Sequence, residues 1–412
     1  MKYGLIGENL SHSFSAPIHE AFGNSNYKIL SLSPDKLDGF LRARDFFGLN
    51  VTIPYKKAVM PYCDHISESA QKIGSVNTLI VDDAGMLTGQ NTDYNGFSKL
   101  AAYTNINFKG KKVAILGSGG TSATAHAVVS DEGAKSILTV SRSGPVNYEN
   151  IHEHRDLDII INTTPVGMYP NNGAAAIDLT PFPVLRGVID VVYNPLKTAL
   201  ILQAESMGIP CTGGLYMLVV QAAVAEELFF SKTIDFDDCL RVFSKLTADM
   251  TNIVLIGMPG SGKTTIGEYV AKHLGREFID TDALIVQKSG MSIPDIFAKY
   301  GENSFRDIEA EVISEAGMKH GAVIATGGGA VLRAENRASL RQNGRIYFIR
   351  RDVSLLSGDG RPLSTSLDAL REMELQRTPI YEELCDMKIN NSGTVSQAVD
   401  RILEETHEYF SH

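Results

Sequence analysis

A glycine-rich pattern late in the chain constrains the fold more than any other feature of this sequence. Residues 257–264 read G-x-x-x-x-G-K-T and follow an apolar run that ends at Ile256. Such a loop lies between a strand and a helix, where backbone N–H groups and the positive helix end hold phosphates. The lysine reaches the β- and γ-phosphates, and the next hydroxyl can bind Mg²⁺. The pattern predicts a nucleoside triphosphate site at Gly260, Ser261, Gly262, Lys263, Thr264 and Thr265.

The position of this loop leaves room for a second protein before it. The chain has 412 residues, and domains of roughly 100–200 residues are usual, so we expect two to four domains. The net charge of −10 argues against nucleic acid as the main partner, and small anionic substrates would need local basic pockets.

The four cysteines are widely spaced, which is typical of free thiols in a reducing cytosol. The N-terminus lacks the apolar region of a signal peptide. The apolar stretch 213–230 is interrupted by Gln221, Glu226 and Glu227, so it indicates a buried helix rather than a membrane span. We expect a cytoplasmic protein that does not contact a membrane.

Apolar β-branched runs alternate with amphipathic stretches along the chain, which predicts α/β architecture with parallel sheets. The expected strands are Lys112–Leu116, Ser136–Ser141, Asp158–Asn162, Val188–Val192, Asn252–Ile256, Val323–Thr326 and Arg345–Ile349. Helices are expected over Leu215–Phe230 and Asp235–Leu246. Polar segments at 103–110 and 247–252 mark the breaks between domains, and no Gly/Pro-rich linker precedes the phosphate loop.

A second glycine-rich turn follows the strand that ends at Leu116. It comprises Gly117, Ser118, Gly119, Gly120 and Thr121, and it matches the dinucleotide pattern G-x-G-x-x-G imperfectly, because a serine or alanine replaces the third glycine. A plain strand-to-helix turn is an equally good interpretation of this motif alone. The next strand ends at Ser141-Arg142-Ser143, where NAD-binding domains carry an acidic residue. An arginine with flanking hydroxyls suits the 2′-phosphate of NADP, although a solvated surface arginine remains an alternative.

Several polar clusters in the first half resemble shikimate dehydrogenase when they are taken together and in order. They are Ser11–Ser15, Asn50–Lys56, Gly74–Thr78, Asn91–Asp93, Asp190–Thr198 and Gly214–Gln221. Each alone could be a cap or a turn. The resemblance spans residues 1–245. It implies that Lys56 and Asp93 are the catalytic pair, and that Val191 and Gly214 join the cofactor site. It also implies substrate contacts from Ser13, Ser15, Thr52, Asn77, Tyr193 and Gln221.

The chemistry of those residues agrees with that resemblance. Reduction of a ketone by hydride leaves an alkoxide that needs a proton from a positioned acid. A lysine beside a carboxylate can stabilise and protonate that oxygen, whereas the plainer interpretation of Lys56 is a surface ion pair. Hydroxyls and amides suit a small ring that bears alcohols and a carboxylate. Because the helix with Gln221 would fold back over the first domain, we expect the cofactor domain to be inserted.

The residues after the phosphate loop resemble shikimate kinase over residues 252–410. The matching stretches are Phe278–Asp282, Glu302–Glu309, Thr326–Ala330, Arg361–Leu363 and Arg377–Tyr381. The resemblance implies that Asp282 holds the substrate hydroxyls and that Asp280 serves Mg²⁺ with Thr264. It also implies that Arg306 and Arg377 bind the substrate carboxylate near Gly328, and that Arg361 meets the phosphates from a lid. Bidentate arginine suits a carboxylate, and phosphoryl transfer needs positioning and charge neutralisation. The lid before Arg361 is short and lacks an additional arginine, which puts the adenine contacts in doubt.

The sequence therefore predicts a fusion of two consecutive enzymes. The first would reduce 3-dehydroshikimate to shikimate with NADPH, and the second would transfer the γ-phosphoryl of ATP to shikimate with Mg²⁺. The expected domains are a substrate domain of residues 1–102 with 215–248, a Rossmann-like NADP domain of 103–214, and a P-loop domain of 249–412. Two alternatives remain: a quinate or shikimate dehydrogenase that uses NAD, or one half kept as a ligand sensor without turnover. We favour halves that work independently over direct transfer of shikimate, and the oligomeric state stays open.

Overall fold

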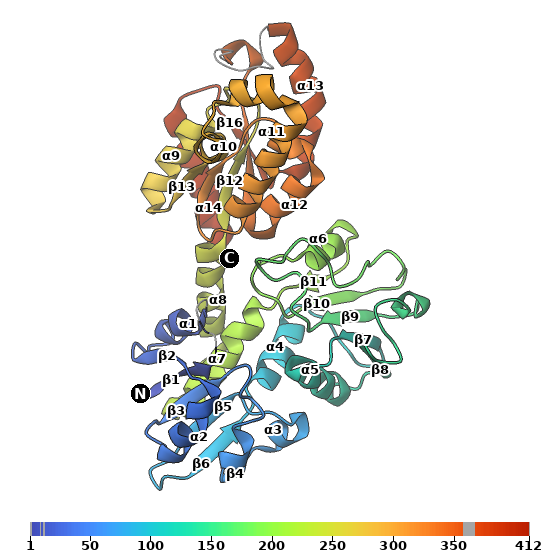
Figure 1. Cartoon of the computed structure of the whole chain (residues 1–412), viewed down its shortest axis with the longest axis vertical. Helices are drawn as coiled ribbons and strands as arrows, with labels where there is room; N and C mark the ends of the chain where they lie inside the picture. The colour runs from blue at the N-terminus through green and yellow to red at the C-terminus, as the bar shows by residue number, and fades with distance from the viewer. Residues whose placement is uncertain (1, 9, 11–12, 357–366, 412) are drawn as a thin grey trace. The chain divides into compact units, whose positions relative to one another are not determined.

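The computed structural model describes residues 2–8, 10, 13–356 and 367–411. The chain divides into two compact units. The first comprises Met1–Met168, Ala174–Asn194 and Gln203–Phe243, and the second comprises Tyr169–Gly173, Pro195–Leu202 and Ser244–His412. The first unit contains two separate sheets and the second contains one (Figure 1).

The first sheet has the strand order β2-β1-β3-β5-β6-β4 and is mixed. Strands β1, β2 and β3 are parallel, whereas β5 is antiparallel to both of its neighbours. Its core contains Ile6, Leu49, Leu79 and Leu87, all fully buried. The elements are β1 (Tyr3–Gly7), α1 (Ser15–Ala21), β2 (Tyr27–Ser31), α2 (Pro34–Ala43), β3 (Gly48–Val51), η1 (Met60–Tyr62), β4 (His65–Ile66), α3 (Glu68–Ile73), β5 (Thr78–Val81), β6 (Leu87–Gln90) and α4 (Asp93–Tyr103).

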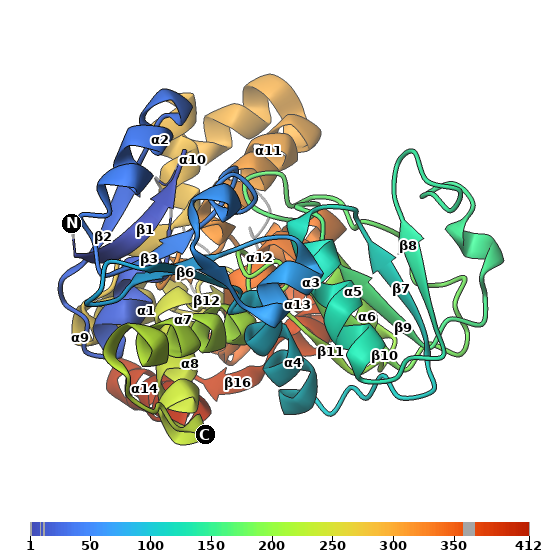
Figure 2. The same ribbon diagram turned by 90° about the horizontal axis from the view of Figure 1, so that it is seen from below.

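The second sheet is wholly parallel, with the order β11-β10-β9-β7-β8. Its central strands are continuous apolar runs, as expected for strands covered on both faces. The elements are β7 (Lys112–Leu116), α5 (Gly120–Asp131), β8 (Ser136–Val140), η2 (Ile151–Glu153), β9 (Ile159–Asn162), β10 (Gly187–Asp190), α6 (Ala199–Ser206) and β11 (Cys211–Thr212). Helix α5 contacts β7 and β8 on one side and α3 and α4 on the other (Figures 1 and 2).

Helix α7 (Leu215–Phe230) follows the second sheet and returns to the first. It packs against α4, α1 and β5 (Figure 1). The helix is apolar on nearly all sides, which is the pattern of a buried helix, and Leu215, Val219 and Ala225 are buried. The sequence interpretation of this stretch is confirmed. Among the described residues, no helix is both long and apolar enough to cross a membrane.

The expected break before the phosphate loop is largely helical. Helix α8 (Phe236–Met250) continues through residues 247–250 and leaves only Thr251 before β12 (Asn252–Ile256). The hydroxyl of Thr251 donates to the carbonyl of Thr247, so the last polar residues complete the helix turn. The predicted helix end at Leu246 was therefore wrong, since the helix continues for four more residues.

The third sheet is parallel, with the order β13-β14-β12-β15-β16. On β12, Val254 and Ile256 pack with α11, α12 and α13, whereas Ile253 and Leu255 pack with α9 and α14. Helices therefore cover both faces (Figure 1). The further elements are α9 (Lys263–Leu274), β13 (Phe278–Asp280), α10 (Thr281–Ser289), α11 (Ile293–Gly317), β14 (Val323–Ala325), η3 (Ala330–Leu332), α12 (Ala334–Asn343), β15 (Gly344–Arg350), η4 (Val353–Leu355), α13 (Leu367–Leu384), β16 (Met387–Asn390) and α14 (Val395–Ser411).

The predicted strands are confirmed, with small differences at their ends. Strand β10 begins one residue early and ends at Asp190 instead of Val192. The carboxylate of Asp190 accepts a hydrogen bond from the backbone N–H of Val192 at 3.0 Å, which turns the chain out of the sheet. The α/β class with parallel sheets is confirmed as well.

Candidate active sites

A lysine and an aspartate meet beside the first sheet. Lys56 follows β3, and Asp93 is the first residue of α4. The Lys56 Nζ donates to Asp93 Oδ2 at 2.5 Å, and the two side chains are 23% and 9% exposed. A carboxylate in the first turn of a helix is favoured by the positive helix end. The structure thus brings together the two residues that the sequence predicts as the catalytic pair.

Two amides adjoin this pair. The Asn77 Nδ2 donates to Gln221 Oε1 at 3.2 Å and to Thr92 Oγ1 at 3.1 Å. In return, the backbone N–H of Thr92 donates to Asn77 Oδ1 at 2.8 Å. Because Thr92 immediately precedes Asp93, these bonds fix the amides relative to the ion pair. Thr52 lies at the end of β3, where its backbone N–H donates to the carbonyl of Ile6 at 2.9 Å.

The two predicted serines lie at the start of α1. The backbone N–H of Ser15 donates to Ser13 Oγ at 3.2 Å. The ring of Phe14, between them, packs edge-on against Tyr193 with 5.9 Å between centroids. Burial raises the pKa of the Tyr193 hydroxyl, so it remains a protonated donor. The contact places Tyr193 beside both serines, although 180 residues separate Ser13 and Tyr193 in the sequence.

The predicted dinucleotide residues gather at the carboxyl ends of the second sheet. Gly117 follows β7 with φ 111°, and a side chain there would approach Thr163 Oγ1 to 2.8 Å. Since β7 pairs with β8 on one side and β9 on the other, the strand order reverses here, which is where such sheets bind nucleotides. The exposed residues Ser118, Gly119 and Gly120 lead into α5, and Thr121 lies in its first turn.

The remaining cofactor predictions fall into two groups. Ser141, Arg142 and Ser143 follow β8, whose carboxyl end lies next to that of β7, and the Arg142 side chain is exposed. Gly214 lies directly against Val191, because a Cβ at this glycine would come within 2.0 Å of the Val191 carbonyl oxygen. Only glycine allows the backbone to approach Val191 so closely. Glycine at position 214 therefore explains how these two positions, which are distant in the sequence, lie in contact.

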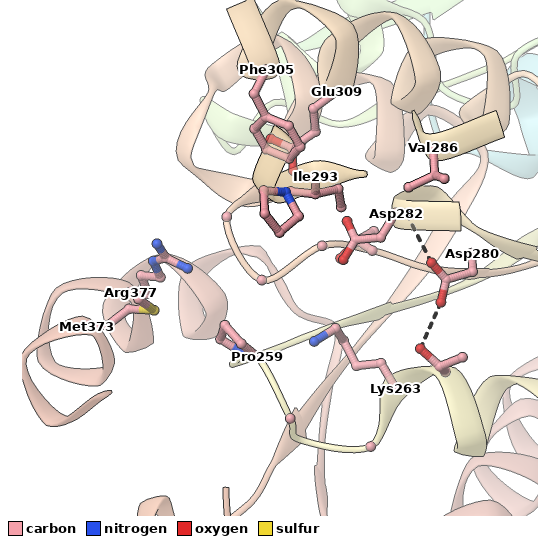
Figure 3. A pocket seen from close by; sticks show the side chains of 18 of the residues that line it. Pro259, Lys263, Asp280, Asp282, Val286, Ile293, Phe305, Glu309, Met373 and Arg377 are labelled. Atoms are coloured by element: carbon pink, nitrogen blue, oxygen red, sulfur yellow. Dashed lines mark hydrogen bonds between the residues drawn. The ribbon is translucent and has the colours of Figure 1, made fainter. Parts of the chain in front are cut away.

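The second unit contains a cavity of about 730 Å³ at the carboxyl ends of its strands (Figure 3). Its walls come from the phosphate loop, α10, α11, the glycine turn after β14, and α13. Predicted residues that line it are Gly260, Gly262, Lys263, Thr264, Thr265, Asp280, Asp282, Arg306, Gly328 and Arg377. Ser261, which is buried, bonds through its carbonyl to Asn391 Nδ2 at 2.7 Å.

Three glycines of the phosphate loop have positive φ, and one of them is Gly260 with φ 80°. Gly257 has φ 143°, and Gly262, which precedes α9, has φ 96°. A Cβ at Gly262 would lie 2.5 Å from Asn391 Nδ2. Lys263, which is 8% exposed, donates through Nζ to the carbonyls of Gly257 and Met258 at 2.9 Å each. The loop thus holds its lysine against the pocket floor.

The predicted metal ligands are adjacent. Thr264 Oγ1 donates to Asp280 Oδ2 at 2.7 Å, and the other oxygen of Asp280 accepts the backbone N–H of Asp282 at 3.0 Å (Figure 3). Asp280 therefore also caps α10. A hydroxyl and a carboxylate are hard oxygen donors of the kind Mg²⁺ binds together with substrate phosphates. The residues present fit this ion.

Two buried arginines, Arg306 and Arg377, each 7% exposed, line the same pocket. Arg306 donates to Glu309 at 2.8 Å and to Glu302 at 3.1 Å. Burial raises the pKa of the Glu309 carboxyl, and Arg306 opposes that rise. Room for Arg306 comes from Gly329, where a Cβ would lie 2.4 Å from the guanidinium.

Sequence reasoning assigned no role to Glu309, although it lies in the same pocket and is 1% exposed. Its spacing of three residues from Arg306 on a helix was the available signal. Tyr381 was quoted in a motif without a role, and its hydroxyl donates to the carbonyl of Gly328 at 2.5 Å. Arg361, predicted to reach the phosphates, lies outside the described residues.

These geometries define two classes of site: a nicotinamide-dependent oxidoreductase in the first unit and a P-loop kinase in the second. Comparisons with known proteins agree. The shikimate dehydrogenase substrate binding domain matches residues 5–79, and the shikimate kinase family matches residues 259–407. A shikimate dehydrogenase (NADP(+)) from Clostridium perfringens strain 13 is 35% identical over 254 residues, which is 57% of this chain and 93% of that protein.

Solved structures give the same result for the first half. A chorismate mutase/shikimate 5-dehydrogenase fusion protein from Clostridium acetobutylicum is 36% identical with a TM-score of 0.56, covering 59% of this chain and 96% of that one. A quinate dehydrogenase from Corynebacterium glutamicum, in complex with NAD, is 29% identical with a TM-score of 0.54, covering 60% and 99%. The chain belongs to the shikimate dehydrogenase family and continues into a shikimate kinase domain. It is an enzyme, with NADP and ATP as the cofactors of its two parts.

Proposed function

We propose that this chain catalyses two consecutive reactions: reduction of 3-dehydroshikimate to shikimate with NADPH, and phosphorylation of the 3-hydroxyl of shikimate by ATP. The observation that carries the proposal is that one unit pairs Lys56 with Asp93, while the other contains a pocket lined by Lys263, Asp282 and Arg306. The two reactions connect chemically, because reduction creates the hydroxyl that the second reaction phosphorylates.

In the first reaction Lys56 is the acid. NADPH, when bound, supplies the hydride to the ketone carbon. Lys56 Nζ donates its proton to the carbonyl oxygen, and Asp93 keeps the ammonium in place at 2.5 Å. Gln221, Asn77 and Thr52 hold the ring hydroxyls, and Ser13, Ser15 and Tyr193 hold the carboxylate end. Gly117 to Thr121, with Val191 and Gly214, form the cofactor floor, and Arg142 with Ser141 and Ser143 meets the 2′-phosphate.

In the second reaction Asp282 orients the acceptor hydroxyl and accepts its proton. The γ-phosphoryl moves from the β–γ bridging oxygen of ATP to that hydroxyl oxygen, and ADP leaves. Lys263 stabilises the charge on the phosphates, and Arg306 and Arg377 hold the substrate carboxylate. Mg²⁺, when bound beside Thr264 and Asp280, neutralises charge on the phosphates. In this proposal Arg361 also contacts the phosphates.

We place the nucleoside end of ATP in a second cavity of about 540 Å³. Arg351 lines both this cavity and the phosphate pocket, so the two are neighbours. The lining residue Asn390 ends β16 and Ser392 lies just after it, and the charged lining residues include Lys388, Arg371, Asp352 and Glu374. We propose that the described residues of this cavity supply contacts to the base and the ribose.

A coupled assay on the purified chain tests the proposal. With 3-dehydroshikimate and MgATP present, we expect no ADP until NADPH is added, and then ADP formation after a lag. Parallel reactions with quinate and NAD address the alternative specificity, which the exposed Arg142 disfavours. If NADPH is not consumed, the dehydrogenase assignment fails. The better interpretation is then that the first half binds a ligand as a sensor without turnover. If shikimate and MgATP give no ADP, the kinase assignment fails.

A further inference from the structure

A buried acid lies behind the dehydrogenase site without contacting it. Glu226 of α7 is fully buried, five residues after Gln221. A buried carboxylate is costly unless it is paired and hydrogen-bonded. One oxygen of Glu226 accepts from Asn24 Nδ2 at 2.8 Å and lies 2.6 Å from His19 Nδ1. The other lies 3.6 Å from Lys232 Nζ. The contact between Glu226 and His19 joins α7 to α1.

His19 links this acid to the helix that begins at Ser15. It lies four residues after Ser15 in α1, on the same helix face, and is 1% exposed. Burial lowers the pKa of the imidazole, and Glu226 opposes that shift. A neutral ring with its proton on Nδ1 satisfies the carboxylate, a tautomer assigned from the hydrogen-bond partner. The ring stacks on Tyr27 with 3.7 Å between centroids.

From Tyr27 a chain of hydrogen bonds leads into the substrate site. The Tyr27 hydroxyl donates to Asn50 Oδ1 at 2.7 Å, and Asn50 Nδ2 donates to Thr78 Oγ1 at 3.1 Å. The Thr78 hydroxyl donates to Asn77 Oδ1 at 3.0 Å, and Asn77 Nδ2 donates to Gln221 Oε1 at 3.2 Å. The network thus returns to α7, which carries both Gln221 and Glu226. We call this closed network the circuit; its members are His19, Tyr27, Asn50, Thr78, Asn77, Gln221 and Glu226.

The hydrogen bonds of the circuit determine which way the Gln221 amide is oriented. Because Asn77 Oδ1 accepts from Thr78, its NH₂ must face Gln221. The oxygen of Gln221 is then the acceptor, which leaves its NH₂ to donate to a substrate oxygen. Rotation of either amide would set two donors or two acceptors against each other.

We infer that His19 and Glu226 are positioning residues of the dehydrogenase, an inference that rests on the proposed reduction of 3-dehydroshikimate. They hold α7 against α1, so that Gln221 keeps its hydrogen bond with Asn77 and presents its NH₂ to the substrate. They act through Gln221 and do not touch the substrate.

Glu226→Gln in the full chain tests this inference, because it keeps the shape of the side chain and removes its charge. We expect kcat/KM for 3-dehydroshikimate to fall about tenfold, with the KM for NADPH and the kinase rate unchanged. Glu227→Gln is the matched control, since Glu227 accepts from the backbone N–H of Ile234 outside the circuit, and we expect less than a twofold change. His19→Phe, which keeps the stacking on Tyr27, serves as a second variant if Glu226→Gln does not fold.

A double-mutant cycle separates positioning from general stability. In a Gln221→Ala background, adding Glu226→Gln should change kcat/KM less than twofold, because the path to the substrate is already broken. An equal loss in both backgrounds, or wild-type kcat/KM in Glu226→Gln and His19→Phe, overturns the inference. A wild-type chain that does not reduce 3-dehydroshikimate overturns the proposed function instead, and the inference with it.

Discussion

Single charged groups control both proposed reactions. Lys56 and Lys263 are both partly or largely buried, and each lies in a site with at least one carboxylate: Asp93 for the first, Asp280 and Asp282 for the second. Each lysine is the group through which charge on oxygen would be stabilised, one on a reduced ketone and the other on phosphate. Because the two sites belong to different units, a substitution in one site should leave the other activity unchanged, and that activity reports the concentration of chain in the assay.

Lys56→Met should lower the dehydrogenase kcat by about 10³-fold, because general acid catalysis contributes about 10²–10⁴-fold. The kinase rate should not change. The measurement is the initial rate of NADPH oxidation at saturating 3-dehydroshikimate. Lys57→Met is the control, since this neighbouring side chain is exposed. A Lys56→Met chain that keeps more than a tenth of the wild-type rate would exclude Lys56 as the acid.

Arg306→Met should destabilise the second unit by about 3–5 kcal/mol at pH 8, because it leaves Glu309 buried without its partner. Folding raises the pKa of Glu309, and loss of Arg306 raises it further. A carboxyl with a raised pKa favours the folded state as the pH falls, so the loss should shrink at pH 5.

Denaturant unfolding followed by circular dichroism at both pH values measures this difference. Arg333→Met is the control, because Arg333 pairs with the exposed Asp307 and such pairs contribute about 0–1 kcal/mol. A destabilisation of equal size at both pH values would show that the charge of Glu309 is not its cause.

At the scale of elements, both proposed sites use the same arrangement. A strand of a parallel sheet ends in a glycine with positive φ, Gly117 after β7 and Gly257 after β12, and a helix follows. In each sheet this strand lies where the strand order reverses, so neighbouring loops diverge and leave a crevice. The positive ends of α5 and α9 then face that crevice.

Gly262→Ala should abolish kinase activity while the dehydrogenase rate stays unchanged. The φ of 96° is unfavourable for alanine, and the added Cβ would lie 2.5 Å from Asn391 Nδ2, so the phosphate loop must shift. Gly275→Ala is the control at the other end of α9, where φ is 64° and no atom lies within 4 Å of an added Cβ. It should cost about 1 kcal/mol of stability and leave ADP formation intact. ADP formation at a normal rate by Gly262→Ala would contradict the loop geometry.

At the scale of the whole molecule, each unit contains the described residues proposed for one reaction. Lys56, Asp93 and Gln221 belong to the first unit, and the lining of the kinase pocket belongs to the second. We therefore propose that the units work independently, and that the divisions at residues 1–102 with 215–248, 103–214 and 249–412 mark functional parts.

A mixture of Lys56→Met and Lys263→Ala chains tests independence. Each supplies one active unit, so the mixture at equal site concentration should form ADP from 3-dehydroshikimate with the lag and rate of the wild type. The measurement is ADP formation after NADPH is added. A shorter lag in the wild type would show that shikimate passes preferentially between joined units.

The sequence determined the fold class, the strands of the two nucleotide-binding sheets and the identity of the chemical groups. Glycine turns and apolar runs are local patterns, and local backbone sterics suffice to interpret them. For the same reason the end of α8 was misjudged, since Thr251 bonds back to Thr247 and extends a helix through polar residues.

Only the tertiary structure decided how these distant groups contact one another within a site. The 2.5 Å contact of Lys56 with Asp93, the packing of Val191 on Gly214, and the circuit from His19 through Asn50 to Gln221 join residues far apart in the sequence. Burial gave Glu309 and Glu226 their importance, because a carboxylate at the surface needs no partner and a buried one does. The apolar pattern of α7 predicted that the helix is buried, but it did not assign partners to Glu226, since those contacts form only when α7 returns to a sheet formed earlier in the chain.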